Sequence, residues 1–339
     1  MDFLAFPLVA AGIYSLIIYG MKKERFSSID QYRGFAILTM VLANYMGGVK
    51  LIPAWLKHAP DIGLTLVDLV APFFIFAIGL TYGLSFRKRL TRDGAGKTYT
   101  HFATRYLALV GIGALMSAGE TAFGENPAGI DWGVLQAIGV AGLITLVVIR
   151  LQAMYRALVG MGMLIVYQIL LDNFLLNLTL RSPHGGLFGS VSWGAMLILC
   201  TVLADLFHAS QKISWFHWAS LGVTIIGIAL AFLLPVSKHR VSSTYVLVST
   251  GLCGLLFAFF HLLSDRWHKN IRLLDAWGSN PLALYIIHYV LIGIFFLPNI
   301  PFLYTDAPLW LVLLEILFLI TMLTLIANWM QRRKIFISL

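Results

Sequence analysis

Residues Ser28–Tyr45 read SIDQYRGFAILTMVLANY, and residues Lys57–Gly79 read KHAPDIGLTLVDLVAPFFIFAIG. The two stretches predict a pair of apolar helices joined by a short polar connection. Both carry groups that lipid-facing helices avoid, because an ionisable side chain at membrane depth is costly unless it faces a cavity or a partner. These groups are Asp30, Arg33, Asn44, His58 and Asp68. Their concentration in one short part of the chain predicts a functional site.

The rest of the chain has the composition of a helical membrane protein. It is 59% hydrophobic and 12% charged, whereas charged residues make up about 25% of a soluble domain, and its mean hydropathy is +0.85. Apolar runs of about 20 residues, long enough to cross a bilayer as helices, recur about eleven times. They lie near residues 3–20, 30–46, 62–86, 102–119, 131–149, 157–176, 187–207, 214–235, 242–263, 278–298 and 308–330. We therefore expect an all-α, polytopic transmembrane bundle that forms a single domain over residues 1–339, with 1–20 as an additional first span.

The positive charges follow the topology of such a bundle. Most of the 24 Lys and Arg residues fall in connections that would share one side, at 21–28, 87–101, 150–156, 208–213, 264–276 and 331–339. By the positive-inside rule, the amino terminus is outside and the carboxyl terminus inside. The net charge of +9 thus reflects topology rather than nucleic-acid binding. The first span precedes its positive charges, as an anchor does, and we expect a bacterial inner membrane protein.

The spacing of the polar residues places them at different depths. Asp30 and Arg33 are three residues apart and share a helix face, where they form a local ion pair or hold part of a ligand. Asn44 follows Arg33 by about 16 Å of helix, so one helix links an inner polar site to an outer one. Asp68 follows His58 by about 15 Å on a straight helix. We therefore expect Asp68 to orient a group from another helix rather than to touch His58.

Histidine carries the predicted chemistry. The sequence has no HExxH, P-loop or Gly-x-Ser-x-Gly motif, and its nine histidines are scattered without a zinc spacing, so we predict no metal. Cys200 and Cys253 both fall in apolar runs and are expected in the core without a disulfide. His58 can take a proton from an attacking amine or hydroxyl, or accept an acyl group itself. Asn44 can donate a hydrogen bond to a developing oxyanion.

The two quoted stretches resemble the heparan-α-glucosaminide N-acetyltransferase family, within a wider group of transmembrane acyltransferases. The resemblance is strong over residues 28–86 and traceable over 28–298. Weaker segments that carry it are GVLQ (Gly133–Gln136), SSTYVLVSTG (Ser242–Gly251) and SNPLALYIIH (Ser279–His288). It implies transfer of an acetyl group from cytosolic acetyl-CoA to an amino sugar or other glycan at the outer face, and a homodimer.

The resemblance also implies roles for single residues. His58 would be the general base, assisted by Asn44 and Asp68. The expected donor-binding residues are Arg33, Asp30, Asn280 and His288, and the expected acceptor-binding residues are Gln136 and His184. Two positions depart from the family pattern: Ala137 replaces an arginine after GVLQ, and Gly185 replaces an acidic residue before Gly186. His184 is a candidate replacement for that acid.

Two alternatives remain open. One is a non-catalytic transporter of a small polar or sugar-like solute, with Asp30, Arg33, Asp68 and His288 along its path. The other concerns mechanism, because transfer is either direct or passes through an acetyl-histidine. We expect direct transfer, since one base suffices when donor and acceptor are bound together. An acyl-imidazole at an aqueous face would also be exposed to hydrolysis.

Overall fold

The computed structural model describes residues 26–122, 131–209 and 213–337, which form helices and no strand. In chain order the elements are α2 (Ser27–Gly48), η1 (Ala54–Leu56), η2 (Val67–Leu69), α3 (Val70–Ala122), α4 (Val134–Val148), α5 (Ala153–Leu170), η3 (Leu171–Leu175), α6 (Leu176–Thr179), η4 (Pro183–Gly185), α7 (Gly186–His208), α8 (Ile213–Leu230), α9 (Ser243–Phe260), η6 (His261–Arg266), α10 (Arg272–Ser279), α11 (Pro281–Phe296), η7 (Pro301–Leu303) and α12 (Leu309–Arg332). The all-α class is confirmed. The expected first span, 1–20, lies outside the described residues.

The number of membrane spans differs from the expected count of about eleven. By length and composition, six stretches of the described residues are apolar and long enough to cross a membrane, or seven if α10 and α11, which meet at 96°, form one broken span. Four features account for the difference. The expected span 3–20 lies outside the described residues, α2 carries polar residues such as Asp30 and Arg33, α4 has only 15 residues, and the stretch Val67–Gly119 counts once although Gly94 interrupts α3. The count of eleven is not confirmed, and the orientation stays a prediction.

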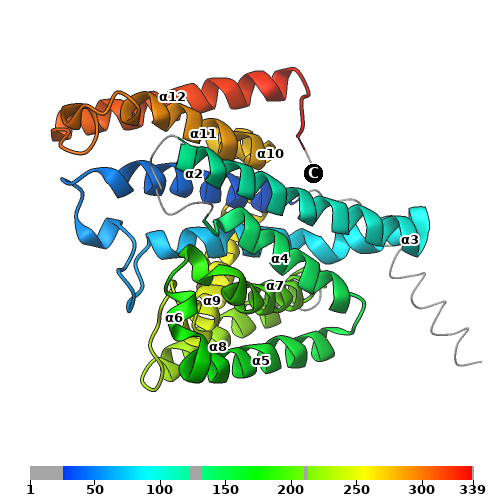
Figure 1. Ribbon diagram of the computed structural model, residues 1–339. Coiled ribbons are helices and arrows are strands. Elements are labelled where there is room, and N and C mark those ends of the chain that lie inside the picture. Colours follow the sequence, from blue (N-terminus) through cyan, green and yellow to red (C-terminus); the bar gives the residue numbers. More distant parts are fainter. Residues whose placement is uncertain (1–25, 123–130, 210–212, 338–339) are drawn as a thin grey trace, which may run out of the picture.

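The connections gather at two ends of the bundle (Figure 1). The α2–α3, α8–α9 and α11–α12 connections lie together on the left of the view. The Gly94 turn of α3, the α4–α5 connection and the described end of α12 lie on the right. Three of the connections that the positive charges assigned to one side therefore share one end of the described part of the chain, and the assignment of that end to the inside stays a prediction.

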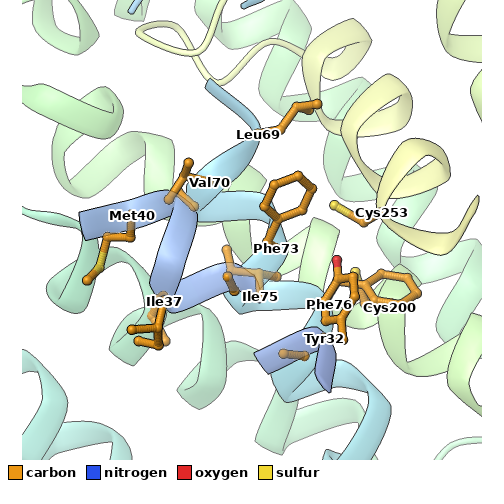
Figure 2. Packing of buried hydrophobic residues seen from close by; sticks show 14 of the residues in the cluster. Tyr32, Ile37, Met40, Leu69, Val70, Phe73, Ile75, Phe76, Cys200 and Cys253 are labelled. Carbon is orange, nitrogen blue, oxygen red and sulfur yellow. The ribbon is translucent and has the colours of Figure 1, made fainter. Parts of the chain in front are cut away.

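An aromatic cluster around Tyr32 fixes the first half of α3 between α2 and α9. Tyr32 is fully buried, and its ring packs in edge or tilted contact, with centroids 5.7–6.1 Å apart. Its partners are Phe73 and Phe76 of α3 and Phe257 and Phe260 of α9. Such pairs add to the burial of the rings themselves. Cys200 and Cys253 lie beside this cluster (Figure 2), and both are free and buried, as expected.

Two glycines allow α2 and α10 to touch backbone to backbone. A Cβ added to Gly34 would overlap the carbonyl oxygen of Leu274, and one added to Gly278 would overlap that of Asp30. Small residues at such crossings permit the closest helix packing. Helix α11 begins directly after Asn280 and lies alongside the second half of α2, where His288 contacts Asn44.

Candidate active site

His58 and Asp68 form a hydrogen-bonded pair at the α2–α3 connection. His58 Nδ1 lies 2.7 Å from Asp68 Oδ1, and the Asp68 side chain is fully buried while that of His58 is 45% exposed. The expectation that the two residues cannot touch is wrong, because it assumed one straight helix. Residues 57–66 are not helical, and the first helical turn begins at Val67, so the loop folds back over its own end.

Three more hydrogen-bond donors, all in the 57–66 connection, bind the same carboxylate. Oδ2 of Asp68 accepts from the Thr65 backbone N–H and hydroxyl, both at 2.9 Å, and from the Ala59 N–H at 3.3 Å. A carboxylate accepts only, so Nδ1 of His58 carries the hydrogen of the shared bond. In the neutral ring, Nε2 is then left with the lone pair that a base needs.

Lys238, expected from the sequence only as one of the charges on the outer side, completes the cluster. Its Nζ lies 3.2 Å from Nδ1 and 3.3 Å from Nε2 of His58, and the residue is 8% exposed. Burial lowers the pKa of Lys238 to about 8, and the negative charge of Asp68 offsets part of that effect. The available signal was its position, four residues before the SSTYVLVSTG segment in a connection between apolar helices.

An ion pair ties the Lys238 loop to the His58 loop. Arg240 Nε lies 2.9 Å and 3.1 Å from the two carboxylate oxygens of Asp61, and its Nη2 contacts Oδ2 as well. Ser237 Oγ donates to Asp61 at 2.8 Å, and the Gly63 N–H donates to the Val236 carbonyl at 2.8 Å. Its hydrogen bonds with Arg240 lower the pKa of Asp61.

The η4 loop (Pro183–Gly185) packs against the loop that carries Lys238, and each loop contains a residue with a positive φ. His184 in the η4 loop has φ 55°, and Val241 in the Lys238 loop has φ 49°. A positive φ is a strained state for a β-branched residue such as valine and costs about 1–3 kcal/mol. Gly185 has φ 74°, and a Cβ there would lie 2.8 Å from Val241 Cγ2. Nδ1 of His184 is buried with no hydrogen-bond partner among the described residues. Strain of this kind persists only where the surrounding structure imposes it.

Of these loop residues, His58, His184 and Lys238 line a cavity of about 230 Å³. Four of the residues singled out in the sequence line it: Asn44, His58, Gln136 and His184. Lys238, Tyr285 and Tyr289 also line it and had not been singled out. Among the described residues, no group of three His, Cys, Asp or Glu side chains could hold a metal ion.

Asn44 and Gln136 are both held by protein partners. Asn44 Nδ2 lies 2.9 Å from His288 Nε2, so His288 stands beside α2 at the depth of the cavity, fully buried. Gln136 caps the start of α4: its Oε1 accepts from the Gly133 N–H at 3.0 Å, and its Nε2 donates to the Asp131 carbonyl at 3.0 Å.

The remaining candidates lie away from the cavity. Arg33 is 3.7 Å from Asp30, as their spacing predicted, and donates to Thr81 Oγ1 at 3.0 Å. Asn280 binds the carboxyl-terminal segment: its Nδ2 donates to the Ile335 carbonyl and its Oδ1 accepts from the Ile337 N–H, both at 2.9 Å. The seven cavity residues named above are therefore separate from Asp30, Arg33 and Asn280.

Comparison with known proteins gives one family. The family model described as Heparan-alpha-glucosaminide N-acetyltransferase, catalytic, matches residues 25–231. The human protein named Heparan-alpha-glucosaminide N-acetyltransferase is 36% identical over 124 residues, and the mouse protein of that name is 32% identical over 124 residues. Each match covers 34% of this chain and 18% of the relative, so the chain spans under a fifth of the curated relatives it matches.

Proposed function

Because the chain belongs to the heparan-alpha-glucosaminide N-acetyltransferase catalytic family, we propose that it is a membrane acetyltransferase. It transfers an acetyl group from acetyl-CoA to the amine or hydroxyl of an amino sugar or other glycan. The acceptor reaches the cavity from the end of the bundle at which the α2–α3 and α8–α9 connections lie. This is the end that the charge distribution assigns to the outside.

The observation that carries the proposal is the His58–Asp68 pair at the wall of the cavity. A histidine held by a buried carboxylate through Nδ1 presents Nε2 as a general base. The acceptor nitrogen attacks the thioester carbonyl carbon while Nε2 takes its proton. The C–S bond then breaks, and His58 returns that proton to the thiolate of CoA. The hydrogen bonds that Asp68 Oδ2 accepts from Thr65 and Ala59 hold the His58–Asp68 pair in place and take no part in the proton transfer.

The size of the cavity constrains where the donor lies. At about 230 Å³ it is below the roughly 300–1,000 Å³ of sites that enclose a whole drug-sized ligand. It therefore fits the acetyl thioester and one sugar ring, while the rest of CoA extends away. Arg33, about 16 Å before Asn44 on the same helix, is our candidate for the phosphates, with Asp30 positioning it. Asn280 would join them only after releasing the carboxyl-terminal segment.

The test is acetyl transfer by purified protein, with glucosamine and a panel of glycans as acceptors. We expect His58→Ala to lower kcat by about 10²–10⁴-fold, the usual worth of a general base. His268→Ala is the control, since His268 is exposed and lies in the connection 264–276, which the positive charges assign to the side opposite His58. Equal activity in the His58→Ala variant and the wild type would remove His58 from catalysis.

One observation favours the transporter. Helices α10 and α11 meet at 96° as a broken pair, and broken helices frame the solute sites of many transporters. Solute flux into proteoliposomes without any acetyl transfer would establish that function. Against it, Asp68 is enclosed by His58 and three other donors rather than placed along a path.

A further inference from the structure

We infer that Lys238, as an ammonium, stabilises the negative charge that develops on the thioester carbonyl oxygen beside His58. The inference rests on the proposed acetyl transfer and adds a residue to that site. Lys238 lies beyond residue 231, where the match to the family model ends. Its assignment therefore comes from the geometry of this chain.

The surroundings of Lys238 are those of a residue that acts on a ligand rather than those of a structural ion pair. It is 8% exposed and lines the cavity. Among the described residues no carboxylate lies within salt-bridge distance of it, and its hydrogen-bond contacts are with His58. A buried charge without such a partner is costly to keep. The fold nevertheless holds this loop in place, through Arg240 and the strained Val241.

The position of Nζ leaves the base available. The Nδ1–H bond and the in-plane lone pair of Nε2 point in diverging directions, so an atom almost equidistant from both nitrogens, at 3.2 and 3.3 Å, lies in line with neither. Lys238 therefore does not block Nε2. A carbonyl carbon whose attacking nucleophile is within reach of Nε2 has its oxygen within reach of Nζ, which is the geometry that an oxyanion donor requires. Asn44, the donor expected from the sequence, already contacts His288 through Nδ2.

The charge state of Lys238 fits this role at neutral pH. The charged or titratable groups that face Lys238 are His58 in the α2–α3 connection, Asp68 in η2, His184 in η4, and the neighbouring His239. Burial lowers the pKa of Lys238 to about 8, so at pH 7 the ammonium exceeds the amine about tenfold. Lys238 keeps its proton through the step: His58 carries the acceptor proton to the leaving thiolate, and charge balances without Lys238 exchanging anything.

The experiment compares Lys238→Met and Lys238→Arg with the wild type, using Lys50→Met as control. Lys50 lies in the α2–α3 connection at the same end of the bundle, is 72% exposed and pairs with Asp306. We expect Lys238→Met to lower kcat by about 10²–10³-fold, the usual effect of losing one oxyanion donor, with the KM for acetyl-CoA changed by less than about threefold. In the wild type we expect kcat to fall above a midpoint near pH 8, where Lys238 loses its proton. Lys238→Arg should move that fall above pH 10 or so, because a guanidinium stays charged.

A second measurement does not depend on activity. Labelling of Lys238 by a trace of acetic anhydride, followed by peptide mass spectrometry, reports its amine fraction against pH. We expect half-maximal labelling near pH 8 in the wild type and at lower pH in Asp68→Asn, which loses the negative charge that favours the ammonium. An unchanged midpoint in Asp68→Asn would show that the two groups do not interact.

Three outcomes would overturn the inference while wild-type transfer persists. They are a Lys238→Met variant within threefold of wild-type kcat, an alkaline fall that both Lys238 variants share, and acetylation of Lys238 by acetyl-CoA at the turnover rate, which would make it a nucleophile. A wild-type protein that transfers acetyl groups to no acceptor would instead contradict the proposed function, and the role of Lys238 with it.

Discussion

Replacing Asp68 by asparagine should leave His58 in place but move its proton to the wrong nitrogen. Oδ1 of Asp68 accepts only from His58, whereas Oδ2 accepts from three donors on Thr65 and Ala59. In Asp68→Asn the amide oxygen takes the Oδ2 position, because an NH₂ group there would meet three donors. The NH₂ group then faces Nδ1 of His58. The ring accepts that hydrogen bond only with its proton on Nε2, where no lone pair remains for a base.

The magnitude follows from the exposure of the ring. Exchanging the buried aspartate of a serine protease triad for asparagine lowers kcat about 10⁴-fold through the same change of tautomer. His58 is 45% exposed, so water can support the productive tautomer for part of the time. We therefore expect a loss of about 10³-fold in kcat, equivalent to about 4 kcal/mol.

The assay measures kcat and KM for acetyl-CoA with glucosamine or the best glycan acceptor, together with the thermal unfolding midpoint. Because the Oδ2 contacts survive, Asp68→Asn should unfold within a few degrees of the wild type. Asp306→Asn is the control, since Asp306 is 49% exposed at the same end. A variant that folds normally and retains kcat within tenfold of the wild type would refute the role of the pair.

Three further results are expected. Protein mixed with labelled acetyl-CoA but no acceptor should carry no stoichiometric label on the His58 peptide, and label formed and discharged at the turnover rate would show an acetyl-histidine route instead. Asp61→Asn should lower kcat about tenfold by loosening the Lys238 loop, and an unchanged kcat would show that the Asp61–Arg240 pair does not position Lys238. Because the pKa of Asp61 is lowered in the fold, the pair stabilises the fold above the ordinary carboxyl pKa, and this contribution is lost as pH falls below about 4. Gly185→Ala should destabilise by about 1–3 kcal/mol, since Gly185 has φ 74° and an added Cβ would lie 2.8 Å from Val241, whereas Gly162→Ala meets nothing within 4 Å and should be neutral or stabilising; equal unfolding midpoints for the two variants would contradict this.

The fold class, and four of the residues that line the candidate site, could be predicted because both depend on local composition. Apolar runs gave the helices, and every expected span from residue 30 onward falls on one. The number of apolar runs differs from the number of membrane-spanning helices, because α3 contains two runs joined at a break and α4 is too short to count as a span. His58 and Asp68 were singled out because each is polar in an apolar setting, which requires no knowledge of their contacts.

The contacts could not be predicted, because they depend on how connections fold. The chain reverses direction at residues 57–66 and so brings Asp68 to His58, a contact that cannot be deduced from the spacing of residues along a helix. Lys238 is 180 residues from its partner, and in the sequence it resembles any outer-side charge. Asn280 was expected to bind the donor, but its amide lies against the carboxyl-terminal segment, a long-range contact with no sequence signal.

The most direct test of the central claim is a cryo-electron microscopy structure of the protein with a non-reactive acetyl-CoA analogue. The acetyl group should lie in the cavity, with its carbonyl carbon beside Nε2 of His58 and its oxygen toward Nζ of Lys238. The pantetheine arm should run along α2 toward Arg33. Analogue density that leaves the cavity empty, or that places the acetyl group against other residues, would contradict it.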